Sequence, residues 1–481
     1  MNKFILGFVF FILTARFFTE TLGVLPKAID LIDIAVIPIL LVMSTTKPDP
    51  KGVDRQLHRR MVLLVGCFLV LCVLSAIVNF ERTSIGPVLL YVFGMLEGPI
   101  FFIALNKLII SKRKFGKQAA RFMNMVLLAQ ILVVAFVSYP LMLASGNPDK
   151  MSGTFGNNSY QFTALLIIIG GYFIGRQYAK PRAAYLAVGI QAFVIITFLL
   201  LQYRTATPSF FVAYALLITI LYGRKFFRMG LIALPLLGIA YFGFKYIDRS
   251  DLGLKYEDLV TVGEDVGMLR DYGKFLSYVN TVSMYGDYPL TVLFGCGPGT
   301  YVSRANYTFT VDLQDTRKGV GSIVTTVFGD KNYLTDVHMK YIYPLSQLES
   351  KFGSVQINNP NSSILAAAAE TGLPGLFIMV SIYSIVVVHS LRYLRYAKAM
   401  HDPLLLPLAS ALFIGATYLV LICPLDNYLE IARVTLPVWL LFWTVSTIVR
   451  QQRTEQAMMR LMAEQQNQEV PEELPDARRL H

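Results

Sequence analysis

Arginine is the residue type in this sequence that most clearly points to chemistry. Arg204 follows an apolar run, Arg270 lies in a polar segment, and Arg433 precedes the last apolar run. A guanidinium group stays charged and can pair with two phosphate oxygens at once. The polar segment from 246 to 360 contains no Asp-Xaa-Asp, the common acidic motif for a divalent metal in sugar transfer. We therefore expect a phosphate site built from arginine and no metal.

Each arginine also has a plainer interpretation, which the sequence leaves open. A charged side chain at the end of an apolar run can extend into polar surroundings without any further role, and this applies to Arg204. Arg270 can be an ordinary charged residue on an amphipathic segment.

A glycine-rich turn and a lone carboxylate are the next candidates. Gly295-Cys296-Gly297-Pro298-Gly299 could hold a phosphate through backbone N–H groups. It lacks the Lys and Ser/Thr of a P-loop, so a tight structural turn is the simpler interpretation. Glu370 follows four alanines at the start of an apolar helix. It is either a cap or ion-pair partner, or a base.

The composition indicates that these residues are positioned by membrane helices. Of the 481 residues, 55% are hydrophobic and only 15% are charged, and the mean hydropathy is +0.53. A membrane span needs about 20 mostly apolar residues, and such stretches recur along the chain. In lipid the backbone must satisfy its own hydrogen bonds, so these stretches are predicted to be helices. The expected fold class is an all-α polytopic membrane protein.

We expect about twelve spans around one large polar loop. Residues 1–245 would contain the first nine transmembrane helices and 363–449 the last three. The polar loop occupies 246–362, and a polar tail occupies 450–481. The predicted spans are 4–22, 27–44, 61–80, 86–106, 122–144, 161–175, 183–201, 208–223, 229–246, 363–390, 403–424 and 435–449.

Lysine and arginine predict the orientation. Alternate connections carry clusters of these residues, at 47–60, 107–121, 176–182, 224–228 and 392–398. The positive-inside rule places these connections and both termini in the cytoplasm, and the 246–362 loop in the periplasm. The net charge of +12 then reflects orientation, and no nucleic-acid partner is expected. The four cysteines have no metal or disulfide spacing.

Four segments predicted to lie on the external side match a known family in order. They are Gly153-Thr154-Phe155-Gly156-Asn157, Gln202-Tyr203-Arg204-Thr205-Ala206, Met268-Leu269-Arg270 leading to the glycine-rich turn, and Asn361-Ser362-Ser363-Ile364-Leu365 leading to Glu370-Thr371-Gly372-Leu373-Pro374-Gly375. Together they resemble the O-antigen polymerase and ligase family, which includes related exopolysaccharide polymerases. The resemblance covers roughly residues 120–390.

The resemblance implies a GT-C-like glycosyltransferase in the bacterial inner membrane. It implies a polymerase that joins undecaprenyl-pyrophosphate-linked repeat units at the periplasmic face, with inversion and without metal, cofactor or nucleotide sugar. Arg204 and Arg270 would stabilise the leaving pyrophosphate. Further substrate contacts are expected from Asn157, Gly297, Gly299 and Arg433. Membrane lipid is an expected partner, and a chain-length regulator or export complex is a potential one.

One departure from the family pattern concerns the catalytic base. The family commonly has His where this chain has Asn361, and an amide cannot take a proton at neutral pH. Asn361 could still orient a hydroxyl or a pyrophosphate oxygen. The proton would go to another group, with His338 first and Glu370 second, or deprotonation would be late and need no dedicated base. The sequence slightly favours late deprotonation.

Three rival functions differ in what they require. An O-antigen ligase, which moves finished glycan onto a lipid A core or a protein, shares the motifs. A flippase of lipid-linked sugars would typically show matched halves with interrupted helices, and no such match is apparent. A structural subunit of an export complex would need none of the arginine pattern.

Overall fold

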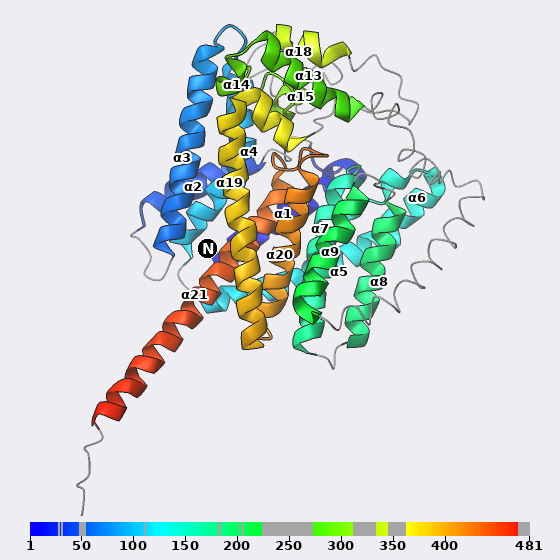
Figure 1. Ribbon diagram of the computed structural model, residues 1–481. Helices are drawn as coiled ribbons and strands as arrows, with labels where there is room; N and C mark the ends of the chain where they lie inside the picture. Colours follow the sequence, from blue (N-terminus) through cyan, green and yellow to red (C-terminus); the bar gives the residue numbers. More distant parts are fainter. Residues whose placement is uncertain are drawn as a thin grey trace, which may run out of the picture.

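The computed structural model shows a helical membrane bundle with a helical cap at one end (Figure 1). It describes residues 1–26, 29, 32–47, 54–109, 112–180, 184–201, 203, 206–223, 273–310, 333–344 and 362–469. Within these ranges every regular element is a helix, which confirms the all-α prediction.

Eight described helices are long and apolar enough to cross a membrane. The protein is therefore a multi-pass membrane protein, as its hydropathy predicts. The candidate spans are Asn2–Thr21, Arg55–Val78, Ile85–Leu108, Lys114–Ser145, Ser159–Ala179, Ser363–Met400, Leu405–Ile422 and Ala432–Gln465.

Three of the remaining predicted spans coincide with shorter apolar helices, namely Ile32–Thr45, Tyr185–Leu200 and Thr207–Tyr222. The predicted span 229–246 lies outside the described residues. The count of twelve spans stays a prediction.

The centre of the bundle is the pair α7 (Ser159–Ala179) and α20 (Leu405–Ile422), which are among the most buried candidate spans. Glycine lets the two backbones approach closely. A Cβ at Gly171 would collide with Ile414, and one at Gly175 would lie 2.5 Å from the Ser410 hydroxyl. Small residues at contacts are the usual means of helix packing in membranes, where lipid offers no hydrophobic drive.

Two long helices flank this centre and lead to the cap. Helix α3 (Arg55–Val78) and helix α4 (Ile85–Leu108) form a hairpin whose turn touches the cap. Beside them run α19 (Ser363–Met400) and α21 (Ala432–Glu469). Other bundle helices are α1 (Asn2–Arg16), α2 (Ile32–Thr45), α5 (Lys112–Val133), α6 (Tyr139–Ser145), α8 (Ala184–Leu200) and α9 (Thr207–Tyr222).

The cap is the described part of the predicted 246–362 loop. It consists of α13 (Gly273–Asp287), α14 (Thr291–Phe294), α15 (Arg304–Thr310) and α18 (Asp336–Tyr341). Arg82 in the α3–α4 turn makes a bidentate pair with Asp336 at 2.7 and 2.8 Å. Tyr285 of α13 donates to the Ala368 carbonyl of α19 at 2.8 Å. The loop thus contains a folded element that is docked on the bundle.

Helix α21 continues past the bundle at the end opposite the cap (Figure 1). The tail predicted to begin at residue 450 therefore starts as a helix that extends to Glu469. The cap and this extension lie at opposite ends, as required if the loop is periplasmic and the C-terminus cytoplasmic. Which end faces the periplasm stays a prediction from the Lys/Arg pattern.

Cysteine labelling tests that orientation. Ser283 on α13 and Thr454 on α21 are both exposed, so either can become cysteine with little cost. The background variant is Cys67→Ala, because Cys67 is exposed while the other three native cysteines are buried. In cells with a permeabilised outer membrane, an impermeant thiol reagent should label Ser283→Cys. Thr454→Cys should react only after inner-membrane lysis, and the reverse pattern would contradict the orientation.

Candidate functional site

The glycine-rich turn is held in place by the carboxylate of Glu370. One oxygen, Oε2, accepts the Gly299 N–H at 2.6 Å. The other, Oε1, accepts the N–H groups of Tyr301, Val302 and Ser303 at 3.0, 2.9 and 2.8 Å. Glu370 is fully buried, so these four bonds replace its hydration. The contacts support the interpretation of Glu370 as a cap.

The same geometry explains the glycines of the turn. Gly295 and Gly299 have positive φ values of 68° and 76°. A Cβ at Gly295 would collide with the Glu370 backbone, and one at Gly299 would lie 2.6 Å from the Pro87 backbone. Since Glu370 already engages the N–H groups of Gly299, Tyr301, Val302 and Ser303, these four are not free for a phosphate. This favours a structural turn, and it gives Gly299 no amide to offer a substrate.

A break in helix α19 lets Glu370 reach the turn. Gly372 has φ 75°, outside the helical region, and Pro374 has no N–H to donate to the Glu370 carbonyl. Ser75 of α3 supplies the missing bond at 3.0 Å. The backbone N–H of Cys296 donates to the Ala369 carbonyl at 2.8 Å. The sequence 370–375 thus encodes a break whose freed carbonyls find partners outside the helix.

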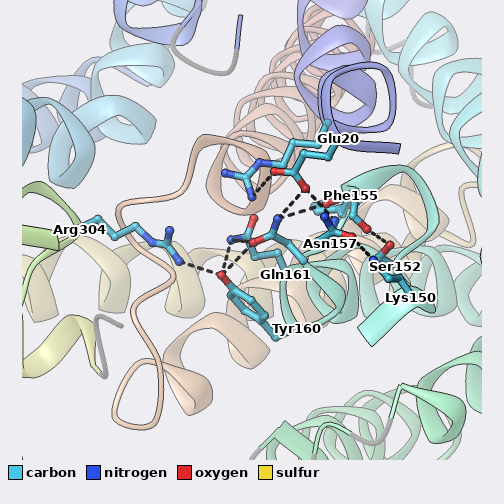
Figure 2. A network of polar contacts seen from close by, with 11 residues as sticks. Glu20, Lys150, Ser152, Phe155, Asn157, Tyr160, Gln161 and Arg304 are labelled. Carbon is cyan, nitrogen blue, oxygen red and sulfur yellow. Dashed lines mark hydrogen bonds and ion pairs between the residues drawn. The ribbon is translucent and has the colours of Figure 1, made fainter. Parts of the chain in front are cut away.

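The turn delivers Arg304 to a polar network at the cap end of the bundle (Figure 2). Arg304 is the first residue of α15 and follows Ser303 directly. Its guanidinium donates to the Tyr160 hydroxyl at 3.3 Å and to the Asn427 carbonyl at 3.4 Å. Tyr160 in turn donates to Asn158 at 3.0 Å. Three segments distant in sequence therefore meet at one partly exposed arginine.

Glu20 connects this network to the segment 153–157. The Asn157 N–H donates to Glu20 at 2.8 Å, and the Lys150 ammonium donates to the Asn157 side chain at 2.9 Å. Glu20 is paired with Arg16 at 3.3 Å. A Cβ on Gly156 would collide with the Glu20 carboxylate, which accounts for glycine there. Asn157 itself is exposed, so its predicted substrate contact is sterically open.

Glu430 completes the network from the loop between α20 and α21. Its Oε2 accepts the Arg304 N–H at 2.9 Å, and its Oε1 accepts the Asn427 amide at 2.6 Å. Its side chain packs against Gly94 of α4, where a Cβ would lie 3.3 Å away. Burial raises the pKa of Glu430 to about 7, while Asn427 and Arg304 oppose the shift.

Arg433 lies close by, at the start of α21. It is partly exposed, and it is near enough to Asp33 of α2 for an electrostatic interaction. Asp33 is hydrogen-bonded to Glu97 of α4, which accepts a bond from Thr435 at 2.9 Å. Arg433 therefore lies at the cap end of the bundle, where the site was predicted, near the carboxyl groups of Asp33 and Glu97.

His338 lies inside the cap, on α18. Its Nδ1 is 2.9 Å from the Tyr301 carbonyl, which can only accept, so Nδ1 carries the proton. Only 8% of the residue is exposed. Burial lowers the pKa of His338, so the ring is neutral at pH 7. His338 is thus hydrogen-bonded to Tyr301, which follows the glycine-rich turn.

Three predicted site residues, Arg204, Arg270 and Asn361, lie outside the described residues. The others share one end of the bundle, as the predicted topology requires. They are Asn157, Gly297, Gly299, His338, Glu370 and Arg433. Among the residues that the structure describes, there is no group of three or more His, Cys, Asp or Glu that could hold a metal.

The sequence reasoning missed Arg304, Tyr160 and Glu430. Arg304 was one of several arginines in the long loop, and nothing in its local pattern distinguished it. Glu430 falls in the short connection between the predicted spans 403–424 and 435–449. Their predicted position could have indicated the contact. An arginine and a carboxylate that are predicted to lie at the same membrane face are candidate partners.

The chain was compared with known proteins. No protein-family model matches it, and no curated protein matches it significantly.

Removing the Glu370 carboxylate should destabilise the protein. Glu370→Ala leaves four N–H groups without their acceptor, and one unsatisfied buried donor alone costs about 1–3 kcal/mol. We expect a loss of at least about 3 kcal/mol, seen as a lower melting temperature in detergent and poor accumulation in membranes. Glu370→Gln keeps one oxygen for the three donors on Oε1 and should lose less. The exposed control Glu464→Ala should match wild type, and a Glu370→Ala variant as stable as that control would contradict the capping role.

Proposed function

We propose that the protein is a glycosyltransferase that acts on glycans linked to undecaprenyl pyrophosphate. The observation that carries the proposal is the Arg304 network. The partly exposed Arg304 guanidinium donates to Tyr160, which donates to Asn158, and Arg304 directly follows the last residue bound by Glu370. Two of the four segments that resemble the O-antigen polymerase and ligase family are thereby connected to Arg304, one through Tyr160 and Asn158 and the other through the chain. The periplasmic inner-membrane site, the twelve spans and the GT-C-like fold belong to the same proposal.

The proposed chemistry is a direct displacement at the anomeric carbon. A sugar hydroxyl attacks that carbon, and the bond to the lipid pyrophosphate breaks with its electron pair going to the pyrophosphate oxygen. Negative charge grows on the leaving group, and positioned guanidinium groups stabilise it without a metal. Displacement from the opposite face inverts the anomeric configuration.

Polymerisation of repeat units is the preferred form of the reaction. Ligation to a lipid A core or a protein uses the same donor and the same leaving group, and only the acceptor differs. The network at the cap end fits either acceptor because it is partly exposed. A flippase of lipid-linked sugars would need neither an attacking hydroxyl nor a leaving group.

Lipid-linked glycans that accumulate without the protein would distinguish these functions. We expect cells lacking the gene to accumulate single repeat units on undecaprenyl pyrophosphate, because chain growth stops after one unit. Mass spectrometry of the extracted lipid-linked glycans measures this. Long chains on lipid would instead indicate a ligase. An unchanged glycan pool would contradict both.

The arginines should be required for product and not for folding. Arg304→Ala should lower product formation by about 10²–10³-fold, the usual loss when one donor to a developing charge is removed. Arg304→Lys should also be poor because the planar fork is lost. Substitution of Arg204 or Arg270 by Ala should abolish product, and substitution by Lys should also be poor.

The matched control for these variants is Arg460→Ala on the exposed extension of α21. Product is measured as polymer yield normalised to the protein in the membrane. Near-normal yield from the lysine variant of any one arginine would remove that residue from a phosphate-binding role.

A further inference from the structure

The carboxylate of Glu430 lies beside Arg304 and can accept more hydrogen bonds than it receives there. Its two oxygens accept bonds from the Arg304 N–H and the Asn427 amide, at 2.9 and 2.6 Å. The Ala305 N–H is a further donor to this carboxylate. A carboxylate offers about four lone-pair sites, so acceptor capacity remains beside these three donors. The residue is partly exposed, as is Arg304. The partly exposed carboxylate can therefore accept a bond from an acceptor hydroxyl as well.

Three other candidate acceptors of a proton at this end are engaged or enclosed. Glu370 is fully buried and accepts four backbone N–H groups. Glu20 is paired with Arg16 and also accepts the Asn157 N–H. His338 is enclosed in the cap.

The charged surroundings of Glu430 come from four elements. Arg304 of α15 and the Asn427 amide favour its ionised form, and burial opposes it. Glu370 of α19, with Glu97 and Tyr91 of α4, also interacts electrostatically with it. The result is a pKa of about 7, in the range where a carboxylate can both lose and take a proton near neutral pH.

We propose that Glu430 is the general base that takes the proton from the attacking sugar hydroxyl. The inference rests on the proposed glycosyltransferase function. As the hydroxyl oxygen bonds to the anomeric carbon, its proton moves to the Glu430 carboxylate. The anomeric C–O bond breaks, and its electron pair stays on the pyrophosphate, next to the guanidinium of Arg304. Glu430 then releases the proton to water.

A purely structural role for Glu430 makes a different prediction. The carboxylate receives the first N–H of α15 and so could serve only to position Arg304. Loss of that role would lower activity equally at every pH. A base, by contrast, must be ionised to act, so activity must rise with pH through its pKa and level off above it.

The experiment compares pH profiles of purified full-length variants. The substrate is the undecaprenyl-pyrophosphate-linked oligosaccharide pool extracted from cells lacking the gene. For wild type we expect product formation to rise between about pH 6 and pH 8. Glu430→Gln should lose about 10²–10⁴-fold at pH 8 and lose the rise. Glu430→Asp should keep the rise at reduced rate.

Asn427→Ala is the second variant and leaves the carboxylate in place. The Asn427 amide lowers the pKa of Glu430, so its removal should shift the midpoint of the rise to higher pH, whatever the height of the plateau. A Glu430→Gln variant that keeps the wild-type rise, or an Asn427→Ala profile with an unchanged midpoint, would overturn the assignment.

The outcome separates this inference from the proposed function. If wild type forms no product from the extracted pool, and the pool contains no truncated glycan, the glycosyltransferase proposal fails. If wild type is active and Glu430→Gln only lowers a profile of unchanged shape, the glycosyltransferase proposal stands. The base assignment then falls.

Discussion

The bonds between Glu370 and the residues after the glycine-rich turn are the interaction on which the candidate site depends. One buried carboxylate fixes four backbone N–H groups, and the last of them belongs to Ser303. Arg304 is the next residue, so its position follows from this anchor. A charge enclosed in protein needs such compensation, because its desolvation otherwise costs several kcal/mol. The position of the site thus depends on a structural contact.

The contacts of Glu370 with the turn require a break in helix α19. In a membrane protein such a break needs partners for the backbone groups that it frees. Irregular backbone is tolerated at membrane depth only where its polar groups find partners. At Gly372 and Pro374 the freed carbonyls of Ala369 and Glu370 are satisfied by Cys296 and Ser75. Helix α3 and the cap therefore both contribute to the break. This couples the cap to the bundle through backbone hydrogen bonds as well as through side chains.

Hydropathy predicted the spans well because it depends on a constraint that acts locally. Any apolar stretch in lipid must bond its own backbone, whatever the rest of the chain does. The site is different, because its contacts join residues far apart in sequence. The bond between Arg304 and Glu430 spans 126 positions, and no periodicity or spacing encodes it. Arg16 interrupts an apolar run in the sequence, and only the fold shows that it pairs with Glu20.

The two glutamates at this end of the bundle show how surroundings divide one chemical group into two roles. Glu370 is fully buried, and three donors converge on a single oxygen, so a proton there would displace bonds that hold the turn. Glu430 accepts bonds on both oxygens, is partly exposed, and faces a cation that supports its ionised form without saturating it. The first arrangement uses the carboxylate to hold the turn, and the second leaves it able to accept a further donor. The number of hydrogen-bond donors around a glutamate can therefore decide its role. Many donors let the carboxylate hold a turn, and fewer let it exchange a proton.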